Sequence, residues 1–209
     1  MRPIRPLASL LSVAVVATPF LLCACSAGAA SHPAENNVPH SDSLRVADCD
    51  GPAVSLPGNL RALLGPRTGQ MIPDDHWADL AERIPGGFAG VLYSKGTPVL
   101  MLTRPQEAIE AKRLLALDPT FNGFDISRAQ VRKARWDFAQ LVDWYRYLVG
   151  HTSVWNTPGM AGGDKNEGAN RIYFGIETEA GRLELRRKLL AADVPCDLIL
   201  IGLQSRATF

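Results

Sequence analysis

The residues best suited to acid–base chemistry lie together at positions 74 to 76. His76 directly follows Asp74 and Asp75, and an Asp–His pair supplies two of the three groups of a nucleophilic triad. The sequence lacks the Gly-x-Ser-x-Gly elbow that would expose a serine as the third group. The simpler interpretation of His76 is a polar side chain on a helix surface. An enzyme centred on these three residues is the alternative.

Oxygen-bearing side chains alternate along the glycine-rich segment from Gly162 to Asn170, a pattern faintly suggestive of calcium ligation. The spacing departs from that of an EF-hand, because the glycine comes one place early and no acidic residue stands at the closing position. A long polar hairpin turn explains the same residues. The sequence therefore predicts neither a metal site nor a cofactor.

The segment Leu22-Cys23-Ala24-Cys25 resembles the lipobox at which bacterial lipoproteins are cleaved and acylated. Cleavage there would make Cys25 the lipidated N-terminus of the mature protein. Cys23 is unusual at its position, and Ala27-Gly28-Ala29 offers an ordinary signal-peptidase site as an alternative.

Residues 1–24 have the composition of a secretory signal peptide, since Arg2 and Arg5 precede an apolar run from Leu7 to Leu22. An uncleaved transmembrane anchor is the third interpretation. It is disfavoured because Pro19 interrupts a run that would need about 18 unbroken apolar residues. All three interpretations place the folded part outside the cytoplasm.

The two remaining cysteines, Cys49 and Cys196, are predicted to form a disulfide that joins the beginning of the folded region to its end. The chain carries 22 basic and 21 acidic residues, a formal net charge of +1. So balanced a charge predicts no nucleic-acid partner. The net charge is also too small to indicate any other kind of partner by electrostatic attraction.

Composition divides the chain after the signal peptide into three parts. Residues 25–46 lack an apolar period and are typical of a flexible tether. Residues 47–86 are rich in turn formers and predict an irregular wrapping segment, with possible helical turns at 60–64 and 75–83. Residues 87–209 show regular periodicities and predict the main folded domain.

An α+β fold is predicted for this domain, with two ββαβ units joined by a helix and small sheets that carry helices on one face. The motif Thr103–Ala108 after the first hairpin resembles Glu177–Ala180 after the second. The expected elements are strands at 88–93, 98–103 and 129–135 around a helix at 106–117, a linking helix from Phe138 capped by Asp137, and strands at 153–156, 171–176 and 197–202 around a helix at 178–192.

Five aromatic residues cluster around the linking helix and are expected mainly to pack in the core, with a minority facing a partner. They are Trp136, Trp144, Tyr145, Tyr147 and Trp155.

Between Gly87 and Ile176 the sequence resembles the pro-region of secreted bacterial chymotrypsin-like serine proteases of the streptogrisin and α-lytic endopeptidase type. The stretches that carry the resemblance are Phe88–Tyr93 with Val99–Thr103, Gln130–Trp136 with Phe138–Leu141, and Ser153–Trp155 with Asn170–Ile176. The resemblance transfers no catalytic residue. In that family the pro-region assists the folding of the protease that follows it and inhibits that protease.

No protease sequence follows here, so the resemblance implies a stand-alone module that recognises a protein through a sheet edge or a helix face. The leading hypothesis is a non-enzymatic, lipid-anchored protein that binds or inhibits an exported protein such as an extracellular serine protease. A structural or accessory lipoprotein of the cell envelope is the alternative from a different class.

Overall fold

The computed structural model describes residues 53–67 and 73–205, and all structural statements below concern these residues. Cys25 and Cys49 lie outside them, so the lipid on Cys25 and the Cys49–Cys196 disulfide stay predictions. None of the described helices is both long and apolar enough to cross a bilayer.

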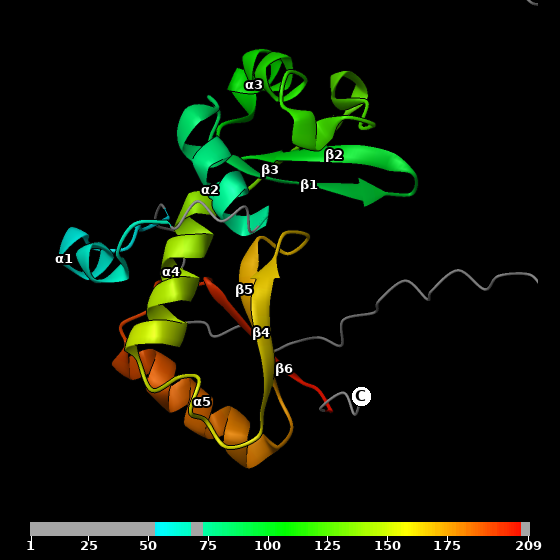
Figure 1. The fold of residues 1–209 in the computed structure, drawn as a ribbon. Coiled ribbons are helices and arrows are strands. Elements are labelled where there is room, and N and C mark those ends of the chain that lie inside the picture. Colours follow the sequence, from blue (N-terminus) through cyan, green and yellow to red (C-terminus); the bar gives the residue numbers. More distant parts are fainter. Residues whose placement is uncertain (1–52, 68–72, 206–209) are drawn as a thin grey trace, which may run out of the picture. The chain divides into compact units, whose positions relative to one another are not determined.

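Two three-stranded sheets form the framework of the domain, and each lies next to its own helix (Figure 1). The helices are α1 Gly58–Arg61, α2 Pro73–Arg83, α3 Ala108–Leu115, α4 Phe138–His151 and α5 Glu179–Ala191, with short 3-10 turns η1 Ala62–Leu64, η2 Pro105–Glu107, η3 Pro119–Phe121 and η4 Ile126–Arg128. The strands are β1 Phe88–Ser94, β2 Thr97–Leu102, β3 Gln130–Lys133, β4 Met160–Asn166, β5 Arg171–Ile176 and β6 Ile199–Leu203.

The predicted α+β fold is confirmed. In the first sheet β1 pairs antiparallel with β2, and β2 pairs parallel with β3 after the crossover through α3. The second sheet repeats this plan with β4, β5 and β6, and its crossover helix is α5. Helix α4 joins the two ββαβ units.

The two units also share their register, which the sequence motifs alone did not predict. Each hairpin has a bulge at its start, between Phe88 and Gly90 in one unit and between Met160 and Gly162 in the other. Each third strand ends on the same bond to the central strand, Ala134 N–H to Leu102 O at 2.8 Å and Gln204 N–H to Ile176 O at 2.8 Å. Equivalent positions can therefore be compared one by one.

One predicted strand is wrong. Residues 153–156 form a turn, in which the Asn156 N–H donates to Ser153 O at 3.1 Å. The first strand of the second unit is β4, built from the glycine-rich residues expected to form the hairpin turn. Its glycines fit because a Cβ on Gly163 would lie 2.7 Å from the Phe174 ring. Packing against β5 here outweighs the low strand propensity of glycine.

Helix α4 contributes to both hydrophobic cores because apolar residues occupy two of its faces. Phe138 and Val142 pack with the first unit and α2, whereas Trp144 and Leu148 pack with the second. The predicted cap is confirmed, since Asp137 accepts from the Gln140 N–H at 2.8 Å and the Gln140 side chain accepts from the Asp137 N–H at 3.1 Å. Such a capping box stabilises a helix start by about 1 kcal/mol.

The aromatic residues around α4 pack largely as expected. Trp136 and Trp144 are buried, and Trp155 is 41% exposed.

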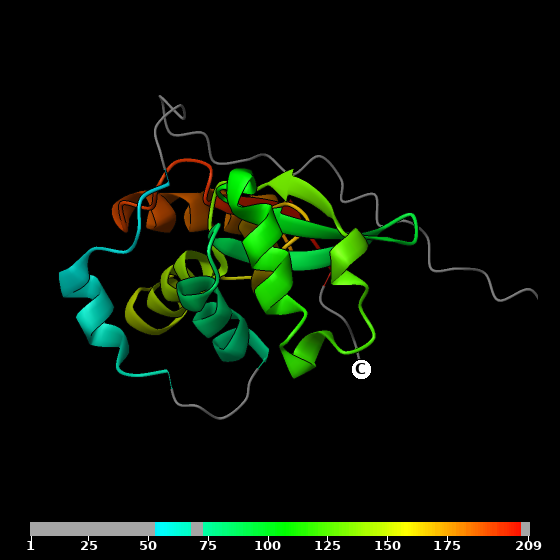
Figure 2. The same ribbon diagram turned by 90° about the horizontal axis from the view of Figure 1, so that it is seen from above.

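The segment before α2 contributes to the same core, since Leu56 is buried and the Trp144 Nε1–H donates to Val54 O at 2.9 Å. Viewed from above, α1 and η1 lie at the outer side of α4 (Figure 2). The helical turns predicted at 60–64 and 75–83 are confirmed, although α2 begins earlier, at Pro73.

Candidate functional site

Asp74, Asp75 and His76 all lie at the start of α2, where His76 and Asp74 take different partners. The His76 Nε2 lies 3.1 Å from Asp118 Oδ1 and 2.8 Å from Thr120 Oγ1. Asp74 instead binds Lys165, with 2.6 Å between its Oδ2 and Nζ. The contacts of His76 and Asp74 both join α2 to other elements of the fold. The His76–Asp118 contact holds the loop after α3 against α2.

Asp118 is a structural carboxylate in this contact. Burial acts to raise its pKa, but the hydrogen bonds from Thr120 and His76 outweigh it and hold the pKa below its usual value. Its Oδ1 also accepts from the Thr120 N–H at 3.0 Å, which caps η3. An ionised acceptor of this kind fixes a turn.

Lys165 is a buried cation that connects the two units. Its side chain is 6% exposed, and its Nζ lies 4.4 Å from the centre of the Tyr145 ring. Burial acts to lower the pKa of Lys165, but the partners Asp74 and Asp164 outweigh it and raise the pKa. Lys165 therefore keeps its charge and ties β4 to α2.

The segment considered for calcium lies partly in β4, where Asp164 points outward with a 78% exposed side chain and Lys165 points inward. Two of the other oxygen-bearing side chains serve backbone groups, since Asn166 Oδ1 accepts from the Ala169 N–H at 2.8 Å and Asn170 Oδ1 accepts from the Arg135 N–H at 2.7 Å. Nowhere in residues 53–67 and 73–205 do three His, Cys, Asp or Glu side chains gather as a metal site would require.

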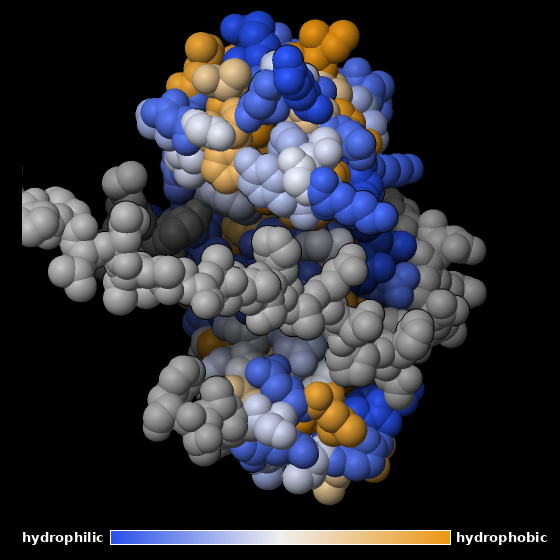
Figure 3. Space-filling view, turned by 90° about the vertical axis from the view of Figure 1, so that its right-hand side faces the viewer, coloured by the Kyte–Doolittle hydropathy of each residue, from blue (hydrophilic) through white to orange (hydrophobic). Residues whose placement is uncertain are grey.

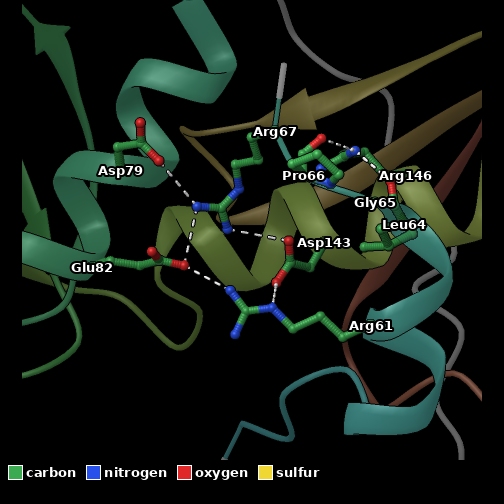
Figure 4. Close-up of a pocket in the computed structure, with 9 residues that line it drawn as sticks. All are labelled: Arg61, Leu64, Gly65, Pro66, Arg67, Asp79, Glu82, Asp143 and Arg146. Atoms are coloured by element: carbon green, nitrogen blue, oxygen red, sulfur yellow. Dashed lines mark hydrogen bonds and ion pairs between the residues drawn. The ribbon is translucent and has the colours of Figure 1, made fainter. Parts of the chain in front are cut away.

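A charged cavity of about 330 Å³ lies between the segment before α2, α2 and α4 (Figure 4). Its lining residues are Arg61, Leu64, Gly65, Pro66, Arg67, Asp79, Glu82, Asp143 and Arg146.

Four of these side chains form a closed ring of alternating charge (Figure 4). Arg61 lies 2.7 Å from Glu82 and 3.0 Å from Asp143, and Arg67 lies 3.0 Å from Glu82 and 3.2 Å from Asp143. Burial acts to lower the pKa of Arg67, but the two carboxylates outweigh it and raise the pKa. The ring joins three chain segments, so its geometry is that of a structural clamp.

The three carboxylates that line the cavity, Asp79, Glu82 and Asp143, are all paired with arginine side chains of the same lining. Arg146 adds a further contact to the clamp, since its Nη2 donates to Leu64 O at 2.8 Å, at the end of η1.

The feature best suited to binding a protein is the outer edge of β6. Leu198 and Gln204 bond to β5 on either side of this strand, at 2.9 Å and 2.8 Å. Because backbone groups alternate in direction along a strand, those of Ile199, Ile201 and Leu203 point away from β5. Within the part of the chain that the structure describes, no strand pairs with this edge.

The equivalent edge in the first unit has a different chemistry. Lys133 pairs with Leu102 as Leu203 pairs with Ile176, so these two positions correspond. Arg132 and Lys133 give β3 the charges that commonly prevent the addition of a strand, whereas β6 carries no charge between Ile199 and Leu203. The outermost residue, Leu203, is 53% exposed.

Sequence reasoning missed the clamp and the contrast between the two edges. The clamp has no sequence signal, because its residues lie far apart in the chain. The uncharged run Ile199–Leu203 was a usable signal for the edge, but its position became informative only once β6 was known to end the sheet.

Comparison with family models, with curated proteins and with solved structures found no match.

Proposed function

We propose that this chain is an exported, lipid-anchored, non-enzymatic module that binds an extracellular serine protease in the manner of a pro-region. The observation that carries the proposal is the uncharged edge of β6, with which no strand pairs in residues 53–67 and 73–205. An extended segment of a partner can add to such an edge through main-chain hydrogen bonds.

Three further features support the proposal. The sequence from Gly87 to Ile176 resembles protease pro-regions, and the segment before Cys25 is typical of a lipoprotein signal. Two of the three residues that could have formed a catalytic site are engaged in structural contacts, His76 with Asp118 and Asp74 with Lys165. These features support a binding function more than a catalytic one.

The proposal predicts that the full chain captures a serine protease from the exported proteins of its own organism and inhibits it at stoichiometric amounts. Affinity capture with mass spectrometry identifies the partner, and inhibition kinetics measure the effect. Capture of no specific exported protein would instead favour an accessory role in the cell envelope.

The variant Leu203→Lys tests the edge directly. It gives β6 the lysine that β3 has at the equivalent position, and because Leu203 is half exposed the fold should tolerate it. We expect inhibition to weaken at least tenfold, since strand addition would desolvate the new charge. Val131→Lys on the edge of β3, where Val131 is 36% exposed, is the matched control and should leave inhibition unchanged. Equal inhibition by both variants would exclude the β6 edge.

A further inference from the structure

The β1–β2 hairpin projects from the domain in two perpendicular views (Figures 1 and 2). Its tip is the two-residue loop Lys95-Gly96, in which both residues have positive φ, 50° and 78°. This geometry is that of a type I′ turn, which strongly prefers Asn-Gly, Asp-Gly or Gly-Gly. Lysine is unusual at the first position.

Lys95 stands out among the described residues with positive φ other than glycine. The other three are Asn170, Asp193 and Asp197, and asparagine and aspartate are the types that tolerate this conformation best. Lys95 is exposed and has no ion-pair partner among the contacts of the described chain. The backbone conformation at Lys95 is therefore less favourable for lysine than for asparagine or glycine, and such an outlier motivates a functional hypothesis for this side chain.

An exposed aromatic pair flanks the tip. Tyr93 is 55% exposed and Phe124 is 36% exposed, and their rings stack with centres 5.5 Å apart and planes 29° apart. Phe124 belongs to the segment between η3 and η4. Aromatic rings next to lysine are the usual composition of surfaces that lie at a membrane interface.

The charge of this sheet has one sign. Residues 88–102 and 130–133 include Lys95, Arg132 and Lys133 but no aspartate or glutamate. All four residues of β3 are exposed. Close to the tip, Arg128 is paired with Asp125 at 3.3 Å and adds no net charge. Lys95, Arg132 and Lys133, which form no ion pair with the described part of the chain, complement an anionic surface.

In the space-filling view of the side to which this hairpin points, apolar patches lie among polar ones over the upper part of the domain (Figure 3). The surface there is therefore mixed, as at an interface between water and lipid, and it is not a continuous apolar face.

We propose that the tip of the β1–β2 hairpin binds the headgroup region of anionic phospholipids, with Lys95 and the Tyr93–Phe124 pair as its contacts. The inference rests on the proposed function to the extent that the lipid on Cys25 would keep the hairpin near a membrane. A projecting amphipathic tip can insert among phospholipid headgroups, because the headgroups of a fluid bilayer rearrange around it. The basic strand β3 would add longer-range attraction.

Vesicle sedimentation of the full chain carrying Cys25→Ser tests the proposal. The readout is the ratio of binding to vesicles that contain phosphatidylglycerol over binding to vesicles of phosphatidylcholine alone. The N-terminal segment, with Arg2 and Arg5, contributes to this ratio as well, so the contribution of the tip is measured by comparing variants that share that segment. We expect a ratio well above one that falls as salt is added.

Lys95→Asn separates the proposed role from any role in folding. Asparagine suits a positive φ better, so the melting temperature should rise, while the binding ratio should fall about fivefold with the loss of one charge. Arg186→Asn, at an exposed position of α5, should leave the ratio unchanged. Tyr93→Ser should lower the ratio, whereas Leu183→Ser, at a position 57% exposed, should not.

A ratio near one in the parent chain, or an unchanged ratio in Lys95→Asn, would overturn the proposal. Loss of the captured exported protein in Lys95→Asn, without vesicle binding by the parent, would assign the tip to a protein interface instead. Vesicle binding without any captured protease would contradict only the proposed function. Protease inhibition without vesicle binding would contradict only the lipid contact.

Discussion

Single residues connect the two units through buried polar contacts. Asn170 is buried, and its Oδ1 accepts from the N–H groups of Arg135 and Trp136 at 2.7 Å and 2.8 Å. Its Nδ2 donates to Trp136 O at 2.8 Å. One amide thereby satisfies three backbone groups where the first unit leads into α4, and such groups are expensive to bury unpaired.

Glu167 is a weak point in the same region. Its side chain packs against Gly90 and near Trp77, since a Cβ on Gly90 would lie 3.3 Å from Glu167 Cγ. Burial, with further contributions from Asp164 and Asp74, outweighs a backbone hydrogen bond at Glu167 and the charge of Lys165, and it raises the pKa of Glu167 above its ordinary value of 4.5. The folded state therefore binds a proton at Glu167 more tightly than the unfolded state does.

We predict that Glu167→Gln raises the free energy of unfolding at neutral pH by on the order of 1 kcal/mol, because it removes a half-buried negative charge. The gain should disappear as the pH falls through the folded pKa towards 4.5, where the glutamate itself is neutral in both states. Urea unfolding at a series of pH values measures this.

The control for this prediction is Glu110→Gln, which removes an exposed carboxylate whose pKa is lowered by its hydrogen bond to Arg113. It should show no gain at neutral pH. A gain in Glu167→Gln that persists at low pH would show that packing rather than ionisation is responsible.

At the scale of elements, the position of β4 is decided by how its glycines pack against neighbouring side chains. A Cβ on Gly163 would lie 2.7 Å and 2.9 Å from two atoms of the Phe174 ring and 3.2 Å from Trp155. A strand of low intrinsic propensity therefore forms because the aromatic side chains of the second core fill the space that a larger residue would occupy.

We predict opposite effects of the same substitution at two glycines. Gly163→Ala should lower the free energy of unfolding by about 1–3 kcal/mol, because the added methyl overpacks the Phe174 contact. Gly150→Ala should raise it by roughly 0.5–1 kcal/mol, because Gly150 lies in α4 with nothing within 4 Å of an added Cβ. Chemical unfolding of both variants measures the difference. Equal effects would contradict this account of β4.

At the scale of the whole molecule, the duplicated plan separates shared architecture from what differs between the units. Both units keep the bulge, the parallel third strand and the closing bond to the central strand. They differ at the edge strands, of which β3 carries charge and β6 does not, and at the hairpin tips, where one unit has Lys95-Gly96 and the other has the loop that begins with Glu167. These differences are the basis of both proposals, since the fold itself does not require them.

The predicted disulfide also belongs to this scale. Cys196 lies in the turn between α5 and β6, and a bond to Cys49 would close a loop around both units. We expect both cysteines to resist a thiol reagent in the native oxidised protein. We also expect reduction to lower the free energy of unfolding by about 3–5 kcal/mol in the chain-entropy model. Thiol labelling and thermal unfolding with and without reductant measure this, with Cys196→Ser as the comparison. Two reactive thiols in the oxidised protein would contradict the pairing.

The sequence by itself determined the fold class, the two repeated units and most of their elements. Periodicity decides which residues can share a face, and Asp137 and Thr178 mark helix starts through local hydrogen bonds. The lipoprotein signal predicted at Cys25 is a linear pattern of the same kind. These features depend on neighbours in the chain and need no tertiary information.

Only the tertiary structure decided where β4 lies, which partners His76 and Asp74 take, and how Arg61, Arg67, Glu82 and Asp143 meet in the clamp. Each of these depends on contacts between residues distant in sequence, whose free energy no local pattern contains. The contrast between the β3 and β6 edges has the same origin. Their residues are visible in the sequence, but the sheet order makes them edges.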